Sequence, residues 1–326
     1  MMPLLARGLA LLVALASGAC AQPTTEPAAP RAPEATARTM AITIDDLPVG
    51  RGHGLAHQQR VTRDLLAQIE AADVPVIGFV NEGKLDERPG EREARIELLQ
   101  AWVDAGHELG NHTYDHPSFF RTPLAQFQEE VVRGEPVTRA LLAARGSAPT
   151  DSLHFFRHPF LNVGPDLETK RAFEAWIAAR GYRIAPVTHD NAEYIYAHAY
   201  DIALDRGDAA LQARIADAYI AYMDTTAAYY EGLSRDLFSR EIPGILLLHS
   251  NALNADHLTR LVDTFRARGY VFNTLDEALE DPAYASEDTY VGRAGMSWLQ
   301  RWAITREVRF TSEPLPHDWV IAVTQP

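Results

Sequence analysis

The chain has 326 residues, 47% of them apolar and 23% charged, and its 44 acidic residues against 30 Lys and Arg give a net charge of −14. This apolar content excludes a wholly disordered chain, and a length of roughly 300 residues is enough for one large or two smaller domains. The negative charge argues against binding to nucleic acid or to an anionic membrane surface. The single cysteine excludes an internal disulfide and a cysteine-based zinc finger.

Residues 1–21 have the layout of a bacterial export signal. Arg7 supplies a positive charge, and residues 9–16 form an apolar run that is too short to span a membrane. Two interpretations of the following Ala-Cys-Ala segment stay open. Cys20 resembles the lipid-accepting cysteine of a lipobox, which we favour, and the same segment is an A-x-A site after which the mature chain would start at Gln22. We therefore expect export to the periplasm or cell envelope, with membrane contact only through a lipid on Cys20.

Residues 22–38 are rich in Pro, Ala and Thr, which predicts a semi-extended tether. From residue 39 to about 280, β-branched runs alternate with helical patterns. We expect strands at 40–45, 74–80, 153–157, 182–186, 244–248 and 270–273, and a turn with a short strand at 106–111. We expect helices at 56–72, 92–105, 124–144, 167–180 and 256–268. This α/β alternation is typical of parallel strands with helices outside, either as an open doubly wound sheet or as a closed (β/α) barrel. No glycine-rich phosphate loop follows a strand, so nothing indicates a nucleotide fold.

Two further segments do not belong to the strand–helix alternation. Residues 191–240 are alanine-rich and mostly helical in pattern, and they are longer than one barrel unit needs. We interpret them as an insertion beside a cleft. Residues 281–326 form a C-terminal extension, in which the spacing of the apolar residues between 298 and 304 predicts one amphipathic helix packed on the barrel.

Reactive side chains gather just past the ends of the expected strands: Asp45 and Asp46, a histidine pair at 112 and 116, Arg157 and His249. Each of them has an ordinary structural explanation alone, because paired aspartates often cap helices and a lone histidine is often only hydrogen-bonded. In a parallel sheet, however, the carboxyl ends of the strands share one mouth. Two histidines and a carboxylate there would hold a metal with open coordination positions, leaving a second carboxylate as base and a separate histidine as acid.

These motifs resemble those of the polysaccharide deacetylases (the NodB homology domain). The resemblance rests on Asp45-Asp46, on Gly-His-Glu-Leu-Gly-Asn-His-Thr around His112, on Arg157-x-Pro-Phe160 and on Leu247-x-His249, in the order and spacing of that family. It implies a distorted (β/α) barrel in which a divalent metal, most often Zn²⁺ or Co²⁺, serves the removal of acetyl groups from an N-acetylated glycan.

The resemblance also implies a role for each matching residue. The metal ligands would be Asp46, His112 and His116. Asp45 would act as the general base toward a metal-held water, oriented by Arg157, and His249 would protonate the departing sugar amine. The backbone N–H near Phe160 would help to stabilise the oxyanion, and Leu247 would line the acetyl pocket.

The sequence departs from the family pattern in two places. Leu47-Pro48 follows the two aspartates where the family usually has glycine. The fourth motif, normally an Asp-containing segment that ends in Trp, is matched only loosely by residues 190–194. Either Asp190 or Glu193 would orient the catalytic histidine there, and Tyr194 would replace the usual Trp in the pocket wall. These changes bear on the substrate more than on the reaction.

The leading prediction is an exported, metal-dependent N-deacetylase that acts on an envelope or extracellular glycan. The same residues also fit an esterase that removes O-acetyl groups, for example from xylan, because one activated water attacks either carbonyl. Two further interpretations involve no catalysis: a silent glycan-binding lipoprotein that retains the barrel, and a protein whose acids and histidines are only solvated loop residues. The sequence leaves the glycan, its linkage and the metal open.

Overall fold

The computed structural model describes residues 38–50, 54–146 and 152–325. The expected export signal and all but the last residue of the expected tether lie outside this range. Seven parallel strands form one sheet in the order β5-β4-β3-β2-β1-β6, and β7 pairs with the start of β1. The strands are β1 (Arg38–Leu47), β2 (Val76–Val80), β3 (Glu108–Asn111), β4 (Phe155–Phe156), β5 (Arg183–Ile184), β6 (Gly244–His249) and β7 (Tyr270–Phe272).

The sheet curls and closes beyond β5. The segment that follows β5 reaches β6, where the N–H groups of Thr188 and His189 donate to the carbonyl of Ile245 at 3.1 and 3.0 Å. The N–H of Leu247 in turn donates to the carbonyl of His189 at 3.2 Å. The distorted (β/α) barrel expected from the sequence is therefore confirmed, and the open doubly wound sheet is excluded.

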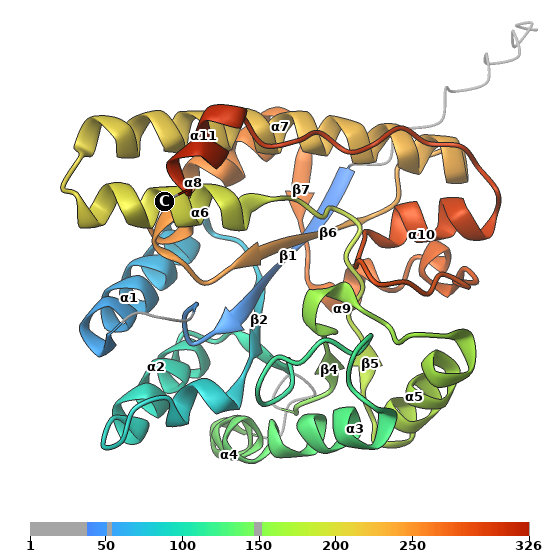
Figure 1. The fold of residues 1–326 in the computed structure, drawn as a ribbon, viewed down its shortest axis with the longest axis horizontal. Coiled ribbons are helices and arrows are strands. Elements are labelled where there is room, and N and C mark those ends of the chain that lie inside the picture. Colours follow the sequence, from blue (N-terminus) through green and yellow to red (C-terminus); the bar gives the residue numbers. More distant parts are fainter. Residues whose placement is uncertain (1–37, 51–53, 147–151, 326) are drawn as a thin grey trace, which may run out of the picture. The chain divides into compact units, whose positions relative to one another are not determined.

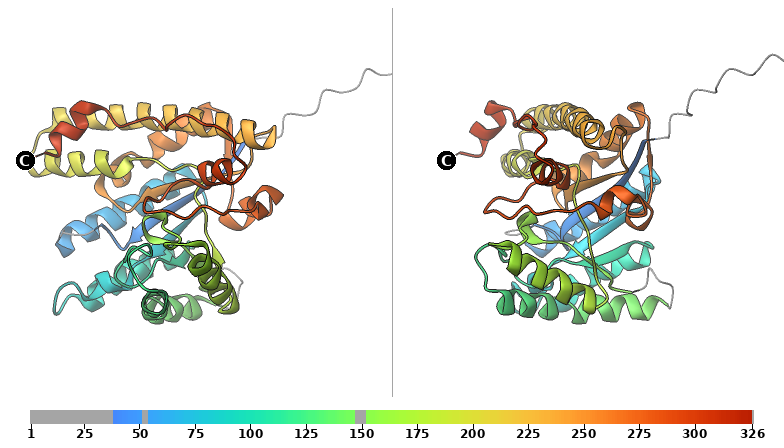
Figure 2. Two further views of the ribbon diagram at one scale, coloured as in Figure 1. Left: turned by 45° about the vertical axis from the view of Figure 1, so that its right-hand side comes forward. Right: turned by 90° about the vertical axis from the view of Figure 1, so that its right-hand side faces the viewer.

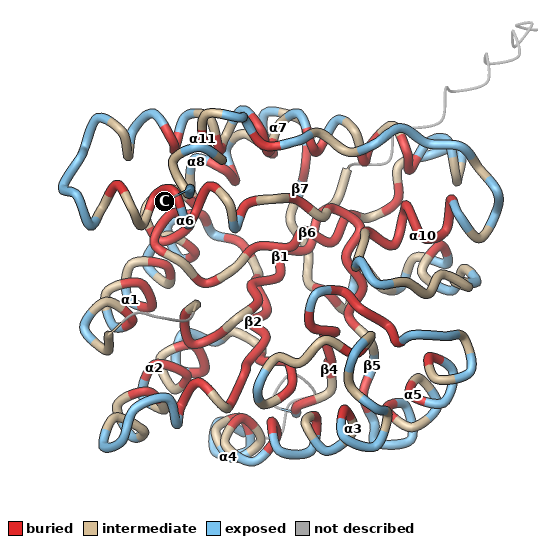
Figure 3. Tube along the Cα trace, in the orientation of Figure 1, coloured by how far each residue is buried: buried red, intermediate tan, exposed pale blue. Residues whose placement is uncertain are grey.

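Helices cover the outside of the strands (Figures 1 and 2). Those that belong to the strand–helix alternation are α1 (Leu55–Ala72), α2 (Arg92–Asp104), α3 (Leu124–Arg133), α4 (Pro136–Arg145), α5 (Leu167–Ala179), α8 (Ala252–Ala267) and the short α9 (Leu275–Ala278). Their apolar faces point inward, as in α1, where Val61, Leu65 and Ile69 are buried at helical spacing. The strands themselves are largely buried, and the exposed residues lie mainly on the outer helix faces and loops (Figure 3).

The regions expected as insertion and extension are helical as well. α6 (Glu193–Asp205) packs against α7 (Ala209–Phe238), α10 (Trp298–Thr305) packs against α7, and α11 (Asp318–Val323) packs against α6. The extension thus contains two α-helices where the apolar spacing predicted one. None of the described helices is long and apolar enough to cross a bilayer. The domain boundaries proposed from the sequence stay a prediction.

The single helix expected over 124–144 is wrong, because the chain forms α3 and α4 instead. Gly134 follows the last residue of α3, and Pro136 begins α4, where its missing N–H and fixed φ suit a helix start and not a helix interior. The Asn111 side-chain amide donates to the carbonyls of Val131 and Gly134 at 2.9 and 3.2 Å, so these carbonyls at the carboxyl end of α3 receive hydrogen bonds from β3. Periodicity alone does not reveal such a partner.

A buried carboxylate caps the start of α4. Glu82 accepts hydrogen bonds from the N–H groups of Val137 at 3.1 Å and Thr138 at 2.7 Å. We expect Glu82→Ala to lower the free energy of unfolding by about 1–2 kcal/mol, the usual cost of losing a helix cap. Urea unfolding measures this change. The exposed Glu97→Ala on α2 is the control and should change stability by less than about 0.5 kcal/mol; equal effects of the two substitutions would contradict the capping role.

Candidate active site

The candidate residues meet at the carboxyl end of the barrel. Asp45 and His249 are paired partners at the ends of β1 and β6, while His112 directly follows β3 and Arg157 directly follows β4. A pocket of about 700 Å³ opens here. Of the residues expected in the site, those that line it are Asp45, Asp46, His112, His116, Phe160, Asp190, Tyr194, Leu247 and His249.

The backbone turns at Asp46, which brings both aspartates into this pocket. Successive strand residues normally point to opposite faces, but Asp46 has a left-handed φ of 72°. The buried Lys84, on the 3₁₀ turn η1 (Glu82–Asp86), lies with Nζ 3.0 Å from Asp46 Oδ1 and donates to the Asp46 carbonyl at 2.7 Å. Burial opposes ionisation, but Lys84 and His116 outweigh it and hold the pKa of Asp46 well below its usual range. Asp46 is thus a carboxylate at neutral pH.

The two histidines present ring nitrogens toward the same point. His112 Nδ1 lies 2.9 Å from the carbonyl of Arg157, and donating to it leaves Nε2 as the unprotonated ring nitrogen. Burial, and to a lesser extent His116, hold the pKa of His112 well below its usual value, so this ring is neutral. His116 Nε2 lies 3.9 Å from Asp46 Oδ1. One ligand atom from each of Asp46, His112 and His116 lies within 4.8 Å of the other two.

This group of three fits a divalent cation. Neutral imidazole nitrogen and carboxylate oxygen are ligands for Zn²⁺, Co²⁺ and related ions, and three protein ligands leave positions open for water or substrate. The hydrogen bond from His112 to the Arg157 carbonyl is the kind of outer contact that orients a metal-ligating ring. The donor set suits several divalent ions equally.

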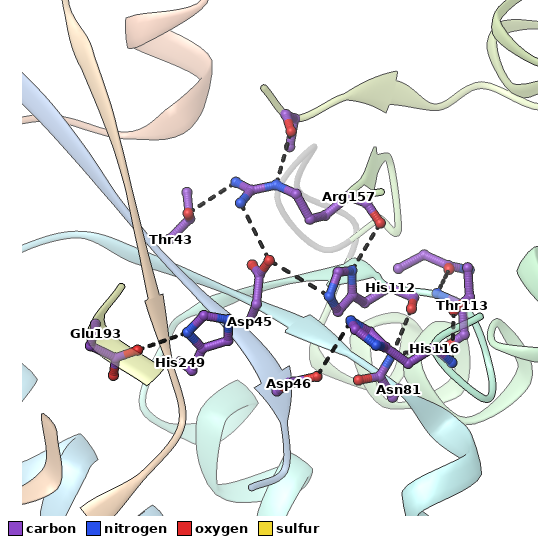
Figure 4. A network of polar contacts seen from close by, with 12 residues as sticks. Thr43, Asp45, Asp46, Asn81, His112, Thr113, His116, Arg157, Glu193 and His249 are labelled. Carbon is purple, nitrogen blue, oxygen red and sulfur yellow. Dashed lines mark hydrogen bonds and ion pairs between the residues drawn. The ribbon is translucent and has the colours of Figure 1, made fainter. Parts of the chain in front are cut away.

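Asp45 lies beside this cluster and is almost fully buried (Figure 4). Its Oδ2 accepts a hydrogen bond from Arg157 Nη1 at 3.4 Å and lies 3.6 Å from His112 Nε2. Arg157 is itself fixed, because it donates to the carbonyl of Ala185 and to Thr43 Oγ1, both at 2.9 Å. Burial raises the pKa of Asp45 to about 6 against the opposing effect of Arg157. Asp45 Oδ1 is buried and has no hydrogen-bond partner among the described residues, so one oxygen of this carboxylate can still accept a proton.

His249 and Glu193 form a pair on the other side of Asp45 (Figure 4). His249 Nδ1 lies 2.8 Å from Glu193 Oε2, and the fully buried Glu193 also accepts hydrogen bonds from the amides of Asn251 and Asn254. Burial disfavours the imidazolium ion, but the hydrogen bond and charge of Glu193 outweigh it and raise the pKa of His249 to about 9. His249 therefore carries a proton at neutral pH and can donate it from Nε2.

Of the two acids that the sequence leaves open, Glu193 makes the hydrogen bond to His249. Asp190 also lines the pocket, but the hydrogen bond it accepts is from the backbone N–H of its neighbour Asn191, at 2.8 Å. Burial and the Glu313 carboxylate raise the pKa of Asp190 to about 7. The structure thus separates the two acids, placing one behind the histidine and the other in the pocket wall.

The three residues expected to contact substrate all line the pocket. Leu247 lies on β6 and is buried, whereas Phe160 and Tyr194 are 58% and 60% exposed. The Phe160 ring packs edge-on against His116, with 4.4 Å between ring centroids. The two exposed aromatic side chains offer flat apolar faces at the edge of the pocket.

Sequence reasoning missed several residues that hold the site together, namely Thr43, Lys84, Asn251, Asn254 and Glu313. Lys84 did leave a signal, because the chain contains only two lysines among its 30 basic residues, and both Lys84 and Lys170 are buried. Glu313 comes from the C-terminal extension and is held by Tyr230 at 2.6 Å. Nothing in the sequence links these distant positions to the motifs.

One family model matches the first half of the described chain. Residues 32–169 match the family model described as polysaccharide deacetylase. This part of the chain is similar to the polysaccharide deacetylase family. The resemblance drawn from its motifs is confirmed, and the family acts on acetylated glycans.

Solved structures similar to this chain include two family 4 carbohydrate esterases. The one from Streptomyces lividans, in complex with acetate, is 18% identical over 74% of this chain and 94% of that chain, with a TM-score of 0.44. The one from Bacillus anthracis is 18% identical over 76% of this chain and 84% of that chain, with a TM-score of 0.44. A pseudoenzyme of the same esterase family from Bacillus anthracis is 15% identical over 76% and 66% of the two chains, with a TM-score of 0.43.

Proposed function

We propose that this chain is a metal-dependent hydrolase that removes acetyl groups from the N-acetylated sugars of an envelope or extracellular glycan. The observation that carries the proposal is the environment of Asp45. This carboxylate is buried, is held by Arg157 and has one oxygen without a partner among the described residues. It lies beside three residues that could hold a cation and opposite a histidine whose pKa is raised to about 9. A base and an acid on either side of one reacting centre are what hydrolysis of an amide requires.

Asp46, His112 and His116 would hold the cation. A divalent cation bound there supplies a Lewis acid, which polarises a carbonyl oxygen and lowers the pKa of water. Lys84 keeps Asp46 ionised, and the Arg157 carbonyl fixes the ring of His112. These contacts would hold the ligand atoms in position before a cation binds.

The chain's own residues would move the protons. Asp45 takes one from the attacking water as the water oxygen bonds to the acetamide carbon, and Arg157 keeps the carboxylate oriented. His249 gives its proton to the sugar nitrogen as the C–N bond breaks, which releases acetate and a free amine. Glu193 stabilises the protonated ring and holds Nδ1, so the transferable proton sits on Nε2. Leu247 and Phe160 would enclose the acetyl group and the sugar.

The charge of the pocket favours an uncharged or cationic sugar over an anionic polymer. The described lining residues include no Lys or Arg and five carboxylic acids, which are Asp45, Asp46, Asp190, Asp201 and Glu313. A bound divalent cation would offset part of this negative charge, but an acidic polysaccharide would still meet repulsion at the pocket. N-acetylated hexosamine chains are neutral, and their apolar faces can stack on Phe160 and Tyr194.

We also propose that the protein is exported and carries a lipid on Cys20. Cells that express the full chain and are fed a radiolabelled fatty acid should incorporate label into the wild type and not into Cys20→Ser. An unlabelled wild type whose mature N-terminus is Gln22 would instead establish cleavage at the A-x-A site.

An acetate-release screen tests the main proposal. Wild-type protein, stripped with a chelator and reloaded with Zn²⁺ or Co²⁺, is incubated with matched N-acetylated and O-acetylated oligosaccharides. We expect metal-dependent acetate release with an equal yield of free amine from the N-acetylated series. Release from the O-acetylated series alone would make the chain an esterase, and glycan binding without any release would make it a silent binding protein.

The pH dependence tests the pairing of His249 with Glu193. Because the pKa of His249 is raised to about 9, the acid is present at neutral pH and is lost as pH rises through that value. We expect Glu193→Gln to move the basic limb of the kcat/KM profile downward by at least about one pH unit. The exposed Glu287→Gln is the matched control and should leave the limb in place. If the basic limb of Glu193→Gln does not move, the titrating group is not His249.

A further inference from the structure

A second cluster of potential metal ligands lies at the opposite end of the barrel from the active site. Glu108 is the first residue of β3, His154 immediately precedes β4, and Asp276 lies on α9. One ligand atom from each of these residues lies within 4.8 Å of the other two. Among the described residues, this cluster and the Asp46–His112–His116 group are the two sets of three that meet this condition.

His154 is oriented as a ligand would be. Its Nδ1 lies 2.7 Å from the carbonyl of Ser152 and can donate to it, which directs Nε2 toward the two carboxylates. Nε2 lies 3.5 Å from Asp276 Oδ2 and 4.0 Å from Glu108 Oε2. Ligand atoms at about 2.1 Å from a tetrahedral Zn²⁺ are roughly 3.4 Å apart, so small side-chain rotations close the site.

The charges of this cluster leave room for a cation. Arg183, the first residue of β5, contacts Asp276 through Oδ1, which leaves Oδ2 directed at His154. Within the described part of the chain, the partly buried Glu108 has His154 as its one ion-pair partner. Burial is the main cause that raises the pKa of Glu108, against the opposing charge of His154, and the repulsion of the neighbouring Asp276 adds to the increase. A divalent cation would relieve this repulsion.

We propose that Glu108, His154 and Asp276 bind a second divalent transition-metal ion, of which Zn²⁺ is the type. One imidazole nitrogen and two carboxylate oxygens form a donor set that Zn²⁺ takes up readily. This site is independent of the acetyl-removing chemistry, because it lies at the amino ends of the strands.

The role of this ion is structural. β4 and β5 contain two residues each, so few backbone hydrogen bonds hold this part of the sheet. A cation at the second site would join the start of β3, the segment before β4 and α9, and Arg183 would add the start of β5 through Asp276. At one edge of the barrel, such a link would take the place of the backbone hydrogen bonds that longer strands would form.

Zinc stoichiometry tests the proposal. Full-length protein is stripped with a chelator and dialysed against micromolar ZnCl₂, and bound zinc is measured by mass spectrometry. We expect two zinc ions per wild-type chain, one in His154→Ala, one in His112→Ala and none in the double variant. His154→Gln and His116→Ala repeat the two single losses with other substitutions. His257→Ala, on α8 and outside both clusters, is the matched control and should keep two.

Thermal unfolding gives the second readout, and it needs no activity. ZnCl₂ should raise the Tm of His112→Ala, which keeps only the second site, and should leave the Tm of the double variant unchanged. One zinc per wild-type chain with none in His112→Ala would overturn the second site and leave the proposed hydrolase intact. Zinc that persists in the double variant would mark adventitious surface binding and would overturn it as well.

Discussion

Replacing Asp45 with Asn should lower metal-dependent acetate release by about 10²–10⁴-fold, the usual contribution of a positioned general base. The substitution removes the proton acceptor while keeping the size and shape of the side chain. The three proposed cation ligands, Asp46, His112 and His116, are untouched, so the variant should still bind zinc at the active site. Acetate release under saturating substrate, together with zinc content, measures both properties in one preparation.

Two further variants serve as controls for Asp45→Asn. His112→Ala should lose both active-site zinc and turnover, because it removes a ligand and not the base. Asp263→Asn, whose side chain is exposed on α8, should change neither property. If Asp45→Asn keeps the wild-type rate, Asp45 is not the base; if it loses zinc as His112→Ala does, its role is to hold the metal.

Replacing Lys84 with Met should destabilise the metal-free protein by about 3 kcal/mol, the cost of removing one partner from a buried ion pair. Lys84 is 3% exposed and its Nζ lies 3.0 Å from Asp46 Oδ1, so the carboxylate loses its main compensating charge. A divalent cation at the same carboxylate would restore that charge. Zinc should therefore raise the Tm of Lys84→Met more than it raises the Tm of the wild type.

The chain offers a matched control in its only other lysine. Lys170 is equally buried, and its Nζ lies 2.8 Å from Asp288 Oδ2. Lys170→Met should destabilise the protein by a similar amount, but zinc should not restore its stability beyond the wild-type increment. Equal responses of the two variants to zinc would contradict a role for Lys84 at the cation site.

Apolar runs and helical periodicity are local signals, so they predicted parallel strands with helices outside. The choice of a barrel over an open sheet came from the family resemblance. The stripe of Val61, Leu65 and Ile69 and the fully buried strand Val76–Val80 both appear where the pattern indicated. The motif residues were found for a related reason. Parallel strands bring their carboxyl ends to one mouth, so Asp45 and His249 can be predicted to be neighbours even when the conformation of the loops is unknown.

Features that depend on distant partners could not be predicted. Pro136 was a local signal for the break between α3 and α4, but the side chains that hold the two helix ends, Asn111 and Glu82, come from other segments of the chain. The choice between Asp190 and Glu193 depends on where α6 begins. Glu193 is the first residue of this helix and contacts His249, whereas Asp190 lies three residues earlier in the chain. The closing of the barrel at His189 rests on backbone hydrogen bonds that leave no pattern in the side chains.

The scarcity of lysine has a practical consequence for handling this protein. Lys84 and Lys170 are the only side-chain amines, and the folded chain exposes 3% and 2% of them. Succinimidyl esters and other acylating reagents should therefore leave the native barrel almost unmodified at side chains. Acylation of Lys84 requires that the contacts of Lys84 with Asp46 open, so its rate would report local unfolding beside the active site.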